Sequence, residues 1–471
     1  MMDWNQLLCN DRIRNYQKST TSRDLRTEFE KDYHRIIGSA SFRRLQDKTQ
    51  VFPLDKSDFI RTRLTHSLEV SSFAKSLGQN VGEKIIKDNI DETFDFNKKE
   101  DICTILQCAG LIHDIGNPPF GHFGETAIQD WFKENLSKKD YNGVPISEQL
   151  NEQMKNDFYH FEGNTQALRV VTKLHFLVDE HGMNLTKALL GTIIKYPVSS
   201  EEIDKKSGNI RNKKMGYFFA DKDIFEEIQN TLGTNGNRHP LTYLLEAADD
   251  IAYKTADIED AIKKGCISYQ DLVNELKQEK KYQNEDSLYH NMVGILEHKY
   301  EKAIQKGYEL PDVYAVQNWI ISIQGNMLFS ASDSFIFHYT EIMSGKYTTD
   351  LFESTAVSEM MQQLGNIAYR YAFISKPIYK LEIAAQTIFY FLLDKFVDAV
   401  INYDTDRYQS VVNQKLITLI SEDYKRIYHC FSKDRTDIEK LYLRLLLVTD
   451  YVCGMTDSYA KNLYQELNGI L

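Results

Sequence analysis

Residues 109–125 read Ala-Gly-Leu-Ile-His-Asp-Ile-Gly-Asn-Pro-Pro-Phe-Gly-His-Phe-Gly-Glu. Upstream of them, apolar residues at helical spacing predict a buried helix that runs up to His113 and Asp114; they are Ile102, Ile105, Leu106, Ala109 and Ile112. Gly116 and the pair Pro118-Pro119 end this helix, because proline donates no backbone hydrogen bond and disfavours helix in the residue before it. The pattern therefore predicts a helix followed by a rigid turn.

Polar side chains flank this turn on both sides. A second helix is predicted to begin near Gly124, which places His122 and Glu125 at its start. Adjacent His113 and Asp114 are costly to bury unless something binds them, and a cation is the simplest explanation. The dipeptide alone also fits a helix C-terminus with a dipole-favoured histidine and a capping aspartate. The surrounding glycines and prolines, with a second histidine and a glutamate, favour a site on a rigid corner.

The composition predicts a mostly α-helical protein. The chain has 471 residues, only 23 glycines and 8 prolines, and long stretches rich in Leu, Ile, Lys, Glu and Gln. We predict an all-α fold in which a helical core carries the site and an elaborated helical region follows it. The division expected is an N-terminal arm over residues 1–35, described as solvated, a core over 36–265, and a C-terminal helical region over 266–471.

Charge and cysteine usage limit the classes of function. The net charge of −12 does not predict nonspecific nucleic-acid binding, so an anionic substrate requires a local basic pocket. The six cysteines are dispersed without a Cys-x-x-Cys pair, which is typical of reduced thiols in a cytosolic protein. No signal peptide is apparent, and the most apolar segment, 383–393, is too short to span a bilayer. We expect a soluble, cytoplasmic protein with no membrane partner.

A second histidine lies in a basic segment upstream. An extended stretch, Thr-Gln-Val-Phe (49–52), is predicted to end at Pro53, and a helix is predicted to begin near Asp58. This helix places His66 in its first turns, close to Arg61 and Arg63. Cations at a helix N-terminus oppose its dipole, so the two arginines favour an anion site over a solvated helix start.

Three further segments contribute candidate residues. A polar stretch over 137–157 is predicted to be an insertion or an exposed loop, and a buried helix over 185–196 is predicted to end with Lys195 and Tyr196. Pro240 opens a helix on which Asp249, Tyr253 and Asp257 follow at i, i+4 and i+8 and line one face. Such a row of carboxylates is usually a solvated face, but this one borders an apolar stripe, so Asp249 can reach an interior metal. After residue 266 only amphipathic helices are predicted; they cover 269–306, 312–330, 355–372, 378–401, 410–432 and 436–467.

Together these residues predict a metal site. His66, His113, Asp114 and Asp249 supply two imidazoles and two carboxylates, leaving about two positions of an octahedral cation for water and substrate. This donor set does not choose among manganese, iron, nickel, zinc and magnesium, and its open positions indicate Lewis-acid hydrolysis. The surrounding cationic side chains indicate a substrate that carries phosphate.

The longer motifs resemble the bacterial deoxyguanosine triphosphate triphosphohydrolases of the HD phosphohydrolase superfamily. The resemblance rests on Lys-Thr-Gln-Val-Phe-Pro (48–53), Arg-Thr-Arg-Leu-Thr-His-Ser-Leu-Glu-Val (61–70), the segment 113–125, Phe-Glu-Gly-Asn (161–164) and Glu-Ala-Ala-Asp-Asp-Ile-Ala-Tyr (246–253). It covers roughly residues 36–262, whereas the C-terminal third matches only in helical character. It implies an HD-domain core and hydrolysis of a deoxynucleoside triphosphate to deoxynucleoside and inorganic triphosphate, with dGTP preferred.

The resemblance also implies roles for single residues. One divalent ion, Mg²⁺ or Mn²⁺ before other transition metals, would be held by His66, His113, Asp114 and Asp249. His122 corresponds to the family's catalytic histidine and Glu125 to the carboxylate that orients it; whether His122 activates water, protonates the leaving oxygen or attacks phosphorus stays open. Substrate contacts carry over to Gln50 (base and sugar), Arg63 (phosphate), Asn164, Lys195 and Tyr196 (phosphate and pocket), and Tyr253 and Asp257 (deoxyribose). The family's arginine and acid from the C-terminal region are not assigned here.

Other functions stay open at this point. A broad-specificity dNTP triphosphohydrolase, an HD phosphatase acting on nucleoside monophosphates or a signalling nucleotide, and a nucleotide-sensing or single-stranded-DNA-binding scaffold all fit part of the pattern. The family resemblance further implies a homo-oligomer, a hexamer, and contacts with single-stranded DNA. Because the net charge is negative, we rank the DNA contacts below the enzymatic function.

Overall fold

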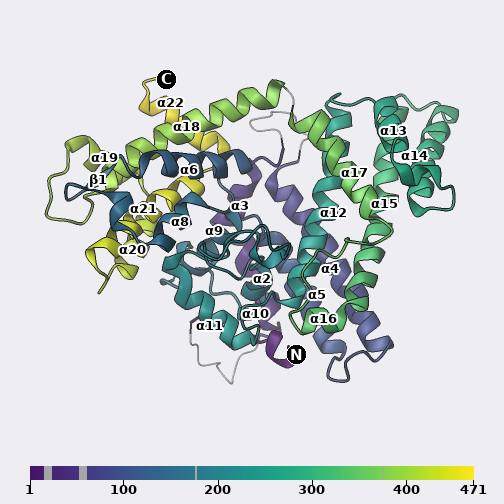
Figure 1. The fold of residues 1–471 in the computed structure, drawn as a ribbon, viewed down its shortest axis with the longest axis horizontal. Helices are drawn as coiled ribbons and strands as arrows, with labels where there is room; N and C mark the ends of the chain where they lie inside the picture. Colours follow the sequence, from purple (N-terminus) through teal and green to yellow (C-terminus); the bar gives the residue numbers. More distant parts are fainter. Residues whose placement is uncertain (15–23, 52–60, 176–177, 375, 471) are drawn as a thin grey trace.

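A computed structural model describes residues 1–14, 24–51, 61–175, 178–374 and 376–470. Almost all regular structure in these ranges is helical, so the all-α prediction is confirmed (Figure 1). The one sheet of the described residues is a hairpin of β1 (Asp140–Tyr141) and β2 (Val144–Pro145), which pair antiparallel. No helix of the described part is long and apolar enough to cross a membrane. The predicted end of the extended stretch at Phe52 and Pro53, and the predicted helix start at Asp58, lie outside the described residues.

The core is built on the pair α4 (Arg63–Lys87) and α5 (Phe96–Ile112). Thr62 begins α4 by accepting from the Thr65 amide, and the Asp95 side chain caps α5 in the same way. The two helices approach closely because Gly110 has no side chain: a Cβ there would lie 2.5 Å from Ser71 Cα. On this pair pack α12 (Pro240–Lys263) and α15 (Pro311–Phe337). The start of α4, the end of α5 and the middle of α12 thereby come together around the candidate metal residues.

The remaining elements before α12 surround this core as short helices. They are α1 (Trp4–Leu7), α2 (Glu28–Ile37), α3 (Ala40–Arg44), η1 (Leu45–Asp47), α6 (His122–Asn135), α7 (Ile146–Gln149), α8 (Glu152–Tyr159), α9 (Gly163–Arg169), η2 (Val170–Leu174), α10 (Lys187–Ile193), η3 (Ile210–Asn212), η4 (Phe219–Asp221) and α11 (Lys222–Leu232). The predicted helix up to His113, the one after the proline pair and the one opening at Pro240 correspond to α5, α6 and α12.

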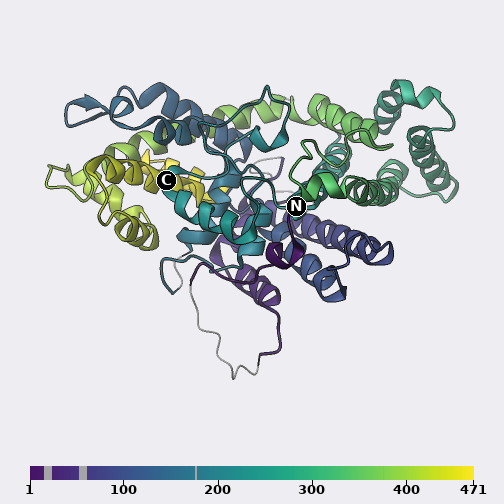
Figure 2. The same cartoon turned by 60° about the horizontal axis from the view of Figure 1, so that its bottom comes forward.

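The helices after residue 266 lie in two groups on opposite sides of the core (Figures 1 and 2). The first group extends the end formed by α12 and α15 and comprises α13 (Tyr269–Lys277), η5 (Lys280–Gln283), α14 (Leu288–Gln305), α16 (Tyr339–Met343), α17 (Ser358–Ala368) and the π-helical turn η6 (Tyr369–Phe373). The second group lies near α6 and α8 and comprises α18 (Lys376–Val400), α19 (Val411–Leu419), α20 (Glu422–Phe431), α21 (Asp437–Cys453) and α22 (Asp457–Leu467). Helix α18 runs along α6 and so brings the C-terminal region against the helix that carries His122.

Two local expectations from the sequence are wrong. Part of the segment described as a solvated N-terminal arm is packed: Trp4 and Leu7 are fully buried, and α2 lies against α5. The polar stretch 137–157 is not a single exposed loop, since it forms the β1–β2 hairpin, α7 and most of α8, with Phe158 at its end fully buried. In both segments a few large apolar side chains are enough to fix the backbone, because each buried aromatic removes a large area from water.

Candidate metal centre and catalytic pocket

Three of the four predicted metal ligands converge at the centre of the fold. His66 lies in the first turn of α4, His113 directly follows α5, and Asp249 lies midway along α12. Asp249 Oδ1 is 3.2 Å from His66 Nε2 and 3.4 Å from His113 Nε2, and one ligand atom from each residue lies within 4.8 Å of the others. Residues separated by 183 positions in the chain therefore share one small site.

The two histidines offer nitrogen atoms that suit a cation. The His113 Nδ1 atom is 2.8 Å from the Gly110 carbonyl oxygen, so it carries the proton and donates to that carbonyl. His113 Nε2 then holds a lone pair toward Asp249, and it is buried with no hydrogen-bond partner among the described residues. A buried acceptor without a partner is costly, and a divalent metal would satisfy it. The residues present fit such an ion.

The fourth predicted ligand, Asp114, lies at the edge of this group. Its Oδ1 is 3.6 Å from His113 Nε2 and accepts a 2.7 Å hydrogen bond from Asn117 Nδ2, while Oδ2 is bonded to the Arg63 guanidinium. The Asp114 carboxylate is thus shared between the metal group and a cation. Its role as a ligand, and the role of Arg63 as a phosphate contact, stay predictions.

The electrostatics of the group keep its carboxylate ionised. Lys195 Nζ lies 2.9 Å from Asp249 Oδ2. Burial opposes the charged form of Asp249, but the Lys195 ammonium and the His113 imidazole together hold its pKa well below the usual range. Asp249 therefore presents a negative charge between two imidazoles, as a cation site requires.

The second predicted pair, His122 and Glu125, is formed as the spacing implies. Helix α6 begins at His122, and His122 Nδ1 lies 2.8 Å from Glu125 Oε2 one turn later. Glu125 is buried and its Oε1 accepts a 2.8 Å hydrogen bond from the Gly163 amide, whereas the His122 side chain is 81 % exposed. The hydrogen bond that His122 donates to Glu125, together with the negative charge of that carboxylate, raises the pKa of His122. The imidazole is held through Nδ1 and leaves Nε2 free for chemistry.

A cavity of about 400 Å³ opens beside His122. Gln50 lines it, and its Oε1 atom is buried without a hydrogen-bond partner among the described residues. The other lining residues come from three parts of the chain: Thr49, Val51, Phe120, Phe123, Tyr369, Phe373, Ile374, Tyr379 and Glu382. A volume of this size is within the range of small-molecule sites. The cavity joins the N-terminal motif to η6 and α18.

The C-terminal wall of this cavity is the part that sequence reasoning missed. Tyr379 and Glu382 lie on α18 and contribute an aromatic ring and a carboxylate to the cavity. Neither belongs to a recognisable motif, and on sequence they read as ordinary positions of an amphipathic helix. The sequence around them carries no signal that marks a binding site.

The remaining predicted substrate contacts are placed around this centre but are not all in one cavity. Asn164 donates a 2.6 Å hydrogen bond to Glu162, and Tyr196 is buried beside Lys195. Tyr253 and Asp257 follow Asp249 on α12 by one and two turns and are not among the described lining residues of the 400 Å³ cavity. Burial raises the pKa of Asp257 to about 8. Their roles toward a sugar stay predictions.

One further cation near this centre was not predicted. Lys214 precedes α11 in a segment in which the sequence indicates no candidate residue, and its Nζ is 2.6 Å from Glu162 Oε2. Burial opposes its charged form, but the charges of Glu162 and Glu125 raise its pKa. Lys214 therefore adds a positive charge close to the His122–Glu125 pair.

The prediction that Arg61 contributes to an anion site is wrong. Its guanidinium binds three carboxylates, with 2.9 Å to Glu69 and 2.6 Å to Asp260 and a further bond to Glu259. The positive charge near the start of α4 is thus neutralised by acidic side chains from α12 and from α4 itself. Arg61 ties these two helices together.

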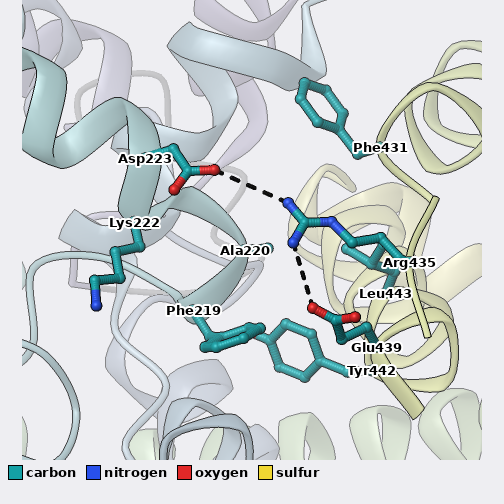
Figure 3. A pocket seen from close by; sticks show the side chains of 9 residues that line it. All are labelled: Phe219, Ala220, Lys222, Asp223, Phe431, Arg435, Glu439, Tyr442 and Leu443. Atoms are coloured by element: carbon teal, nitrogen blue, oxygen red, sulfur yellow. Dashed lines mark hydrogen bonds and ion pairs between the residues drawn. The ribbon is translucent and has the colours of Figure 1, made fainter. Parts of the chain in front are cut away.

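A second pocket, of about 140 Å³, lies between the start of α11 and the helices α20 and α21 (Figure 3). Arg435 crosses it and pairs with Glu439 at 3.3 Å and with Asp223 at 3.9 Å. Phe219 and Tyr442 form an aromatic wall. None of the predicted site residues is among the described residues that line this pocket.

Comparison with known proteins agrees with this geometry. Residues 63–191 match the HD domain family, a range that includes His66, His113, Asp114 and His122. The chain is 46% identical over 474 residues to a deoxyguanosinetriphosphate triphosphohydrolase-like protein of Listeria monocytogenes, with 100% of both chains covered. It is similar to a protein of the same description from Synechocystis, 34% identical with 100% of each covered, and to a deoxyguanosinetriphosphate triphosphohydrolase of Yersinia pestis, 31% identical with 93% of each covered.

Proposed function

Because this chain belongs to the HD-domain family of deoxyguanosinetriphosphate triphosphohydrolase-like proteins, we propose that it hydrolyses dGTP to deoxyguanosine and inorganic triphosphate. One observation supports this most directly: His122, held by Glu125, lines the same cavity as Gln50 and is separated by a short turn from the His113-Asp114 pair. A proton-transfer group and a candidate base contact thus face one space next to a cation site.

We propose that the activity depends on one divalent ion, Mg²⁺ or Mn²⁺. His66, His113 and Asp249, with Asp114 beside them, would hold it. Bound there, the ion would polarise the α-phosphate of the nucleotide. Two nitrogen donors with carboxylates are compatible with Mn²⁺ and other transition metals as well as with Mg²⁺.

The protein's own side chains would move the proton. With Nδ1 engaged by Glu125, His122 can accept or donate a proton only at Nε2. It would take a proton from the attacking water or give one to the leaving 5′ oxygen, and the Glu125 carboxylate, which raises the pKa of His122, makes the imidazole a stronger base. Glu125 acts through the orientation and basicity of this ring.

The triphosphate would be held by the cations around the centre. Arg63, Lys195 and Lys214 are all buried or half-buried and come from different segments. In the structure each one is bonded to a carboxylate, Asp114, Asp249 or Glu162, so its charge is already positioned before substrate arrives. Asn164 and Tyr196 lie beside them and complete the proposed phosphate contacts.

The base of the nucleoside would occupy the cavity beside Gln50. The free Oε1 of Gln50 can accept a hydrogen bond from a base or sugar, and the aromatic wall from η6 and α18 can stack on a base. The deoxyribose would lie outside that cavity, on the side of α12, where Tyr253 and Asp257 are proposed to meet it and a packed tyrosine leaves no room for a 2′-hydroxyl group. A preference for dGTP over the other dNTPs depends on these contacts.

A product assay tests the proposal. The protein is incubated with each of the four dNTPs and with GTP, in Mg²⁺ or Mn²⁺, and the products are separated by ion-exchange chromatography. We expect inorganic triphosphate and deoxynucleoside, fastest from dGTP, and no product from GTP. Equal rates on all four dNTPs would indicate a broad-specificity triphosphohydrolase; orthophosphate would indicate an HD phosphatase. A His122→Ala variant that binds dGTP and turns it over as fast as the unaltered protein would contradict the proposed role of the pair.

A further inference from the structure

The start of the C-terminal helix α22 is bonded to two walls of the 400 Å³ cavity. Asp457, its first residue, is buried with only 2 % of its surface exposed. Its Oδ1 accepts a 2.9 Å hydrogen bond from the Phe120 amide, and its Oδ2 accepts a 3.1 Å hydrogen bond from the Thr49 amide and another from the Thr49 hydroxyl. One carboxylate thus bridges segments 337 and 408 residues away in the chain.

Both bonded residues stand next to groups of the proposed site. Thr49 precedes Gln50, and Phe120 lies two residues before His122; all four line the same cavity. Thr49 is also paired with Thr62, which caps α4, so this segment is fixed to the helix that carries His66. The carboxylate of Asp457 therefore sets the spacing between the proposed nucleoside contact and the proton-transfer group.

The turn before His122 needs such an external support. Phe120 and Gly121 have φ values of 59° and 60°, a left-handed conformation that is unfavourable for phenylalanine. Without Asp457 the Phe120 amide would be a buried donor with no other hydrogen-bond partner among the described residues. The carboxylate stabilises a strained turn and satisfies its backbone in one contact.

A neighbouring lysine also links the end of α21 to the turn before His122. Lys48 is buried, and its Nζ donates to the carbonyl oxygens of Asn117 at 2.6 Å and Cys453 at 2.7 Å. Ser458 donates a 2.9 Å hydrogen bond to Asp47. The junction of α21 and α22, residues 453–458, is thus bonded to both loops that border the cavity.

We propose that Asp457 is a positioning residue for the hydrolysis: it holds Gln50 and His122 at the separation that one deoxynucleotide spans. This rests on the proposed function. Displacement of either segment by about 1 Å can lower the rate by about 100-fold, because the reacting groups no longer meet in line. Asp457 itself touches no substrate in this proposal.

The test compares Thr49→Val with Thr49→Ser, since both keep the backbone and only serine keeps the hydroxyl that donates to Asp457. We expect Thr49→Val to lower kcat/KM for dGTP by about tenfold, the equivalent of one lost charge-assisted hydrogen bond. Thr49→Ser, which also alters the lining of the cavity but keeps the hydroxyl, should lower it by less than half as much on a logarithmic scale. Asp457→Asn, which must present an NH₂ group to one of the donors, should lower kcat/KM by about 100-fold, with effects on both kcat and KM.

A matched control exists elsewhere in the chain. Asp32 is equally buried and accepts from the Thr186 amide at 3.0 Å and from the Thr186 hydroxyl at 2.7 Å; its other oxygen pairs with Arg12 at 2.6 Å. Asp32→Asn should lower the melting temperature as Asp457→Asn does, while kcat and KM measured well below that temperature stay within twofold of the unaltered protein. Binding of Mn²⁺ should be the same in all these variants.

A double-mutant cycle completes the test. If the Thr49 hydroxyl acts through Gln50, then Thr49→Val should have less than half its logarithmic effect in a Gln50→Ala background. Three outcomes would overturn the positioning role alone, provided that the unaltered protein releases triphosphate. They are full additivity of the two substitutions, an equal loss in Thr49→Val and Thr49→Ser, and unchanged kinetics in Thr49→Val. An unaltered protein that releases no triphosphate from any dNTP would overturn the proposed function, and with it this role.

Discussion

His122 Nδ1 lies 2.8 Å from Glu125 Oε2, and the far oxygen of that carboxylate accepts from the Gly163 amide at 2.8 Å. The Glu125 carboxylate is buried and the His122 imidazole is exposed, so the buried negative charge acts on an imidazole that solvent and substrate can reach. This geometry leaves Nε2 as the nitrogen that can react, and it makes the His122 imidazole more basic.

Glu125→Gln should therefore lower both the rate and the pKa of His122. Because Glu125 raises that pKa, its removal moves the pH limb of kcat/KM that reports His122 toward lower pH, whichever direction the proton moves in the reaction. We expect kcat to fall by about 10–100-fold. A pH–rate profile of dGTP hydrolysis measures both effects.

The chain offers a matched control for this variant. His338 and Glu341 form the same i, i+3 pair at 2.8 Å beside α16, away from the proposed site. Glu341→Gln should leave the pH profile unchanged. A profile of Glu125→Gln that superimposes on that of Glu341→Gln would refute the role of the pair.

Asp249→Asn should abolish metal binding. It removes the negative charge between His66 and His113, and we expect Mn²⁺ affinity, measured by isothermal titration calorimetry, to fall by more than the roughly 10–100-fold that loss of an outer-shell partner costs. Triphosphate release should fall with it. Asp250→Asn, one residue further on α12 and paired with Lys254 at 3.3 Å, should retain Mn²⁺ binding. Equal affinities in the two variants would exclude Asp249 as a ligand.

Arg61→Met tests whether Arg61 stabilises the fold instead of binding an anion. It leaves Glu69, Glu259 and Asp260 without their shared cation, and we expect the free energy of unfolding to fall by about 1–3 kcal/mol in urea denaturation. Lys84→Met, which breaks a more exposed pair with Asp333, should change it by less than about 0.5 kcal/mol. If Arg61 bound substrate instead, KM for dGTP would rise while stability stayed constant.

The buried carboxyl group of Asp157 should make the free energy of unfolding depend on pH. Burial raises its pKa to about 7, although Tyr442, Ser200 and the Phe219 amide all donate to it. The folded state therefore holds this proton more tightly than the unfolded chain, whose pKa for aspartate is about 4. The stabilising contribution is complete below about pH 4 and is lost as pH rises through 7.

Asp157→Asn cannot titrate and should flatten this dependence. We expect its urea midpoint to vary less than that of the unaltered protein between pH 4 and 7. Asp437→Asn serves as control, because Asp437 accepts a similar bond from Tyr141 at 2.7 Å on an exposed position. Parallel curves for the unaltered protein and Asp157→Asn would show that Asp157 is ionised throughout.

The sequence by itself determined the helical class and the corner at residues 113–125, and its resemblance to the HD phosphohydrolases singled out His66, His113 and Asp249. The helical class and the corner follow from local signals: apolar residues at helical spacing, a proline pair that ends a helix, and polar residues that interrupt an apolar face. The i, i+3 relation of His122 and Glu125 is equally local, and the structure forms it at hydrogen-bond distance.

The tertiary structure alone decided which distant groups meet. Arg61 was expected to bind an anion and instead pairs with acids of α12. Glu382 lines the cavity and Asp457 is bonded to the cavity's walls, although neither residue lies in a helix that carries a recognisable motif. A helix sequence specifies which face is apolar, but not which partner covers it or which side chain at its end enters a cavity, because helix packing allows several crossing geometries. Partners hundreds of residues apart leave no mark in the local pattern, and their pairing is fixed only when the whole core packs.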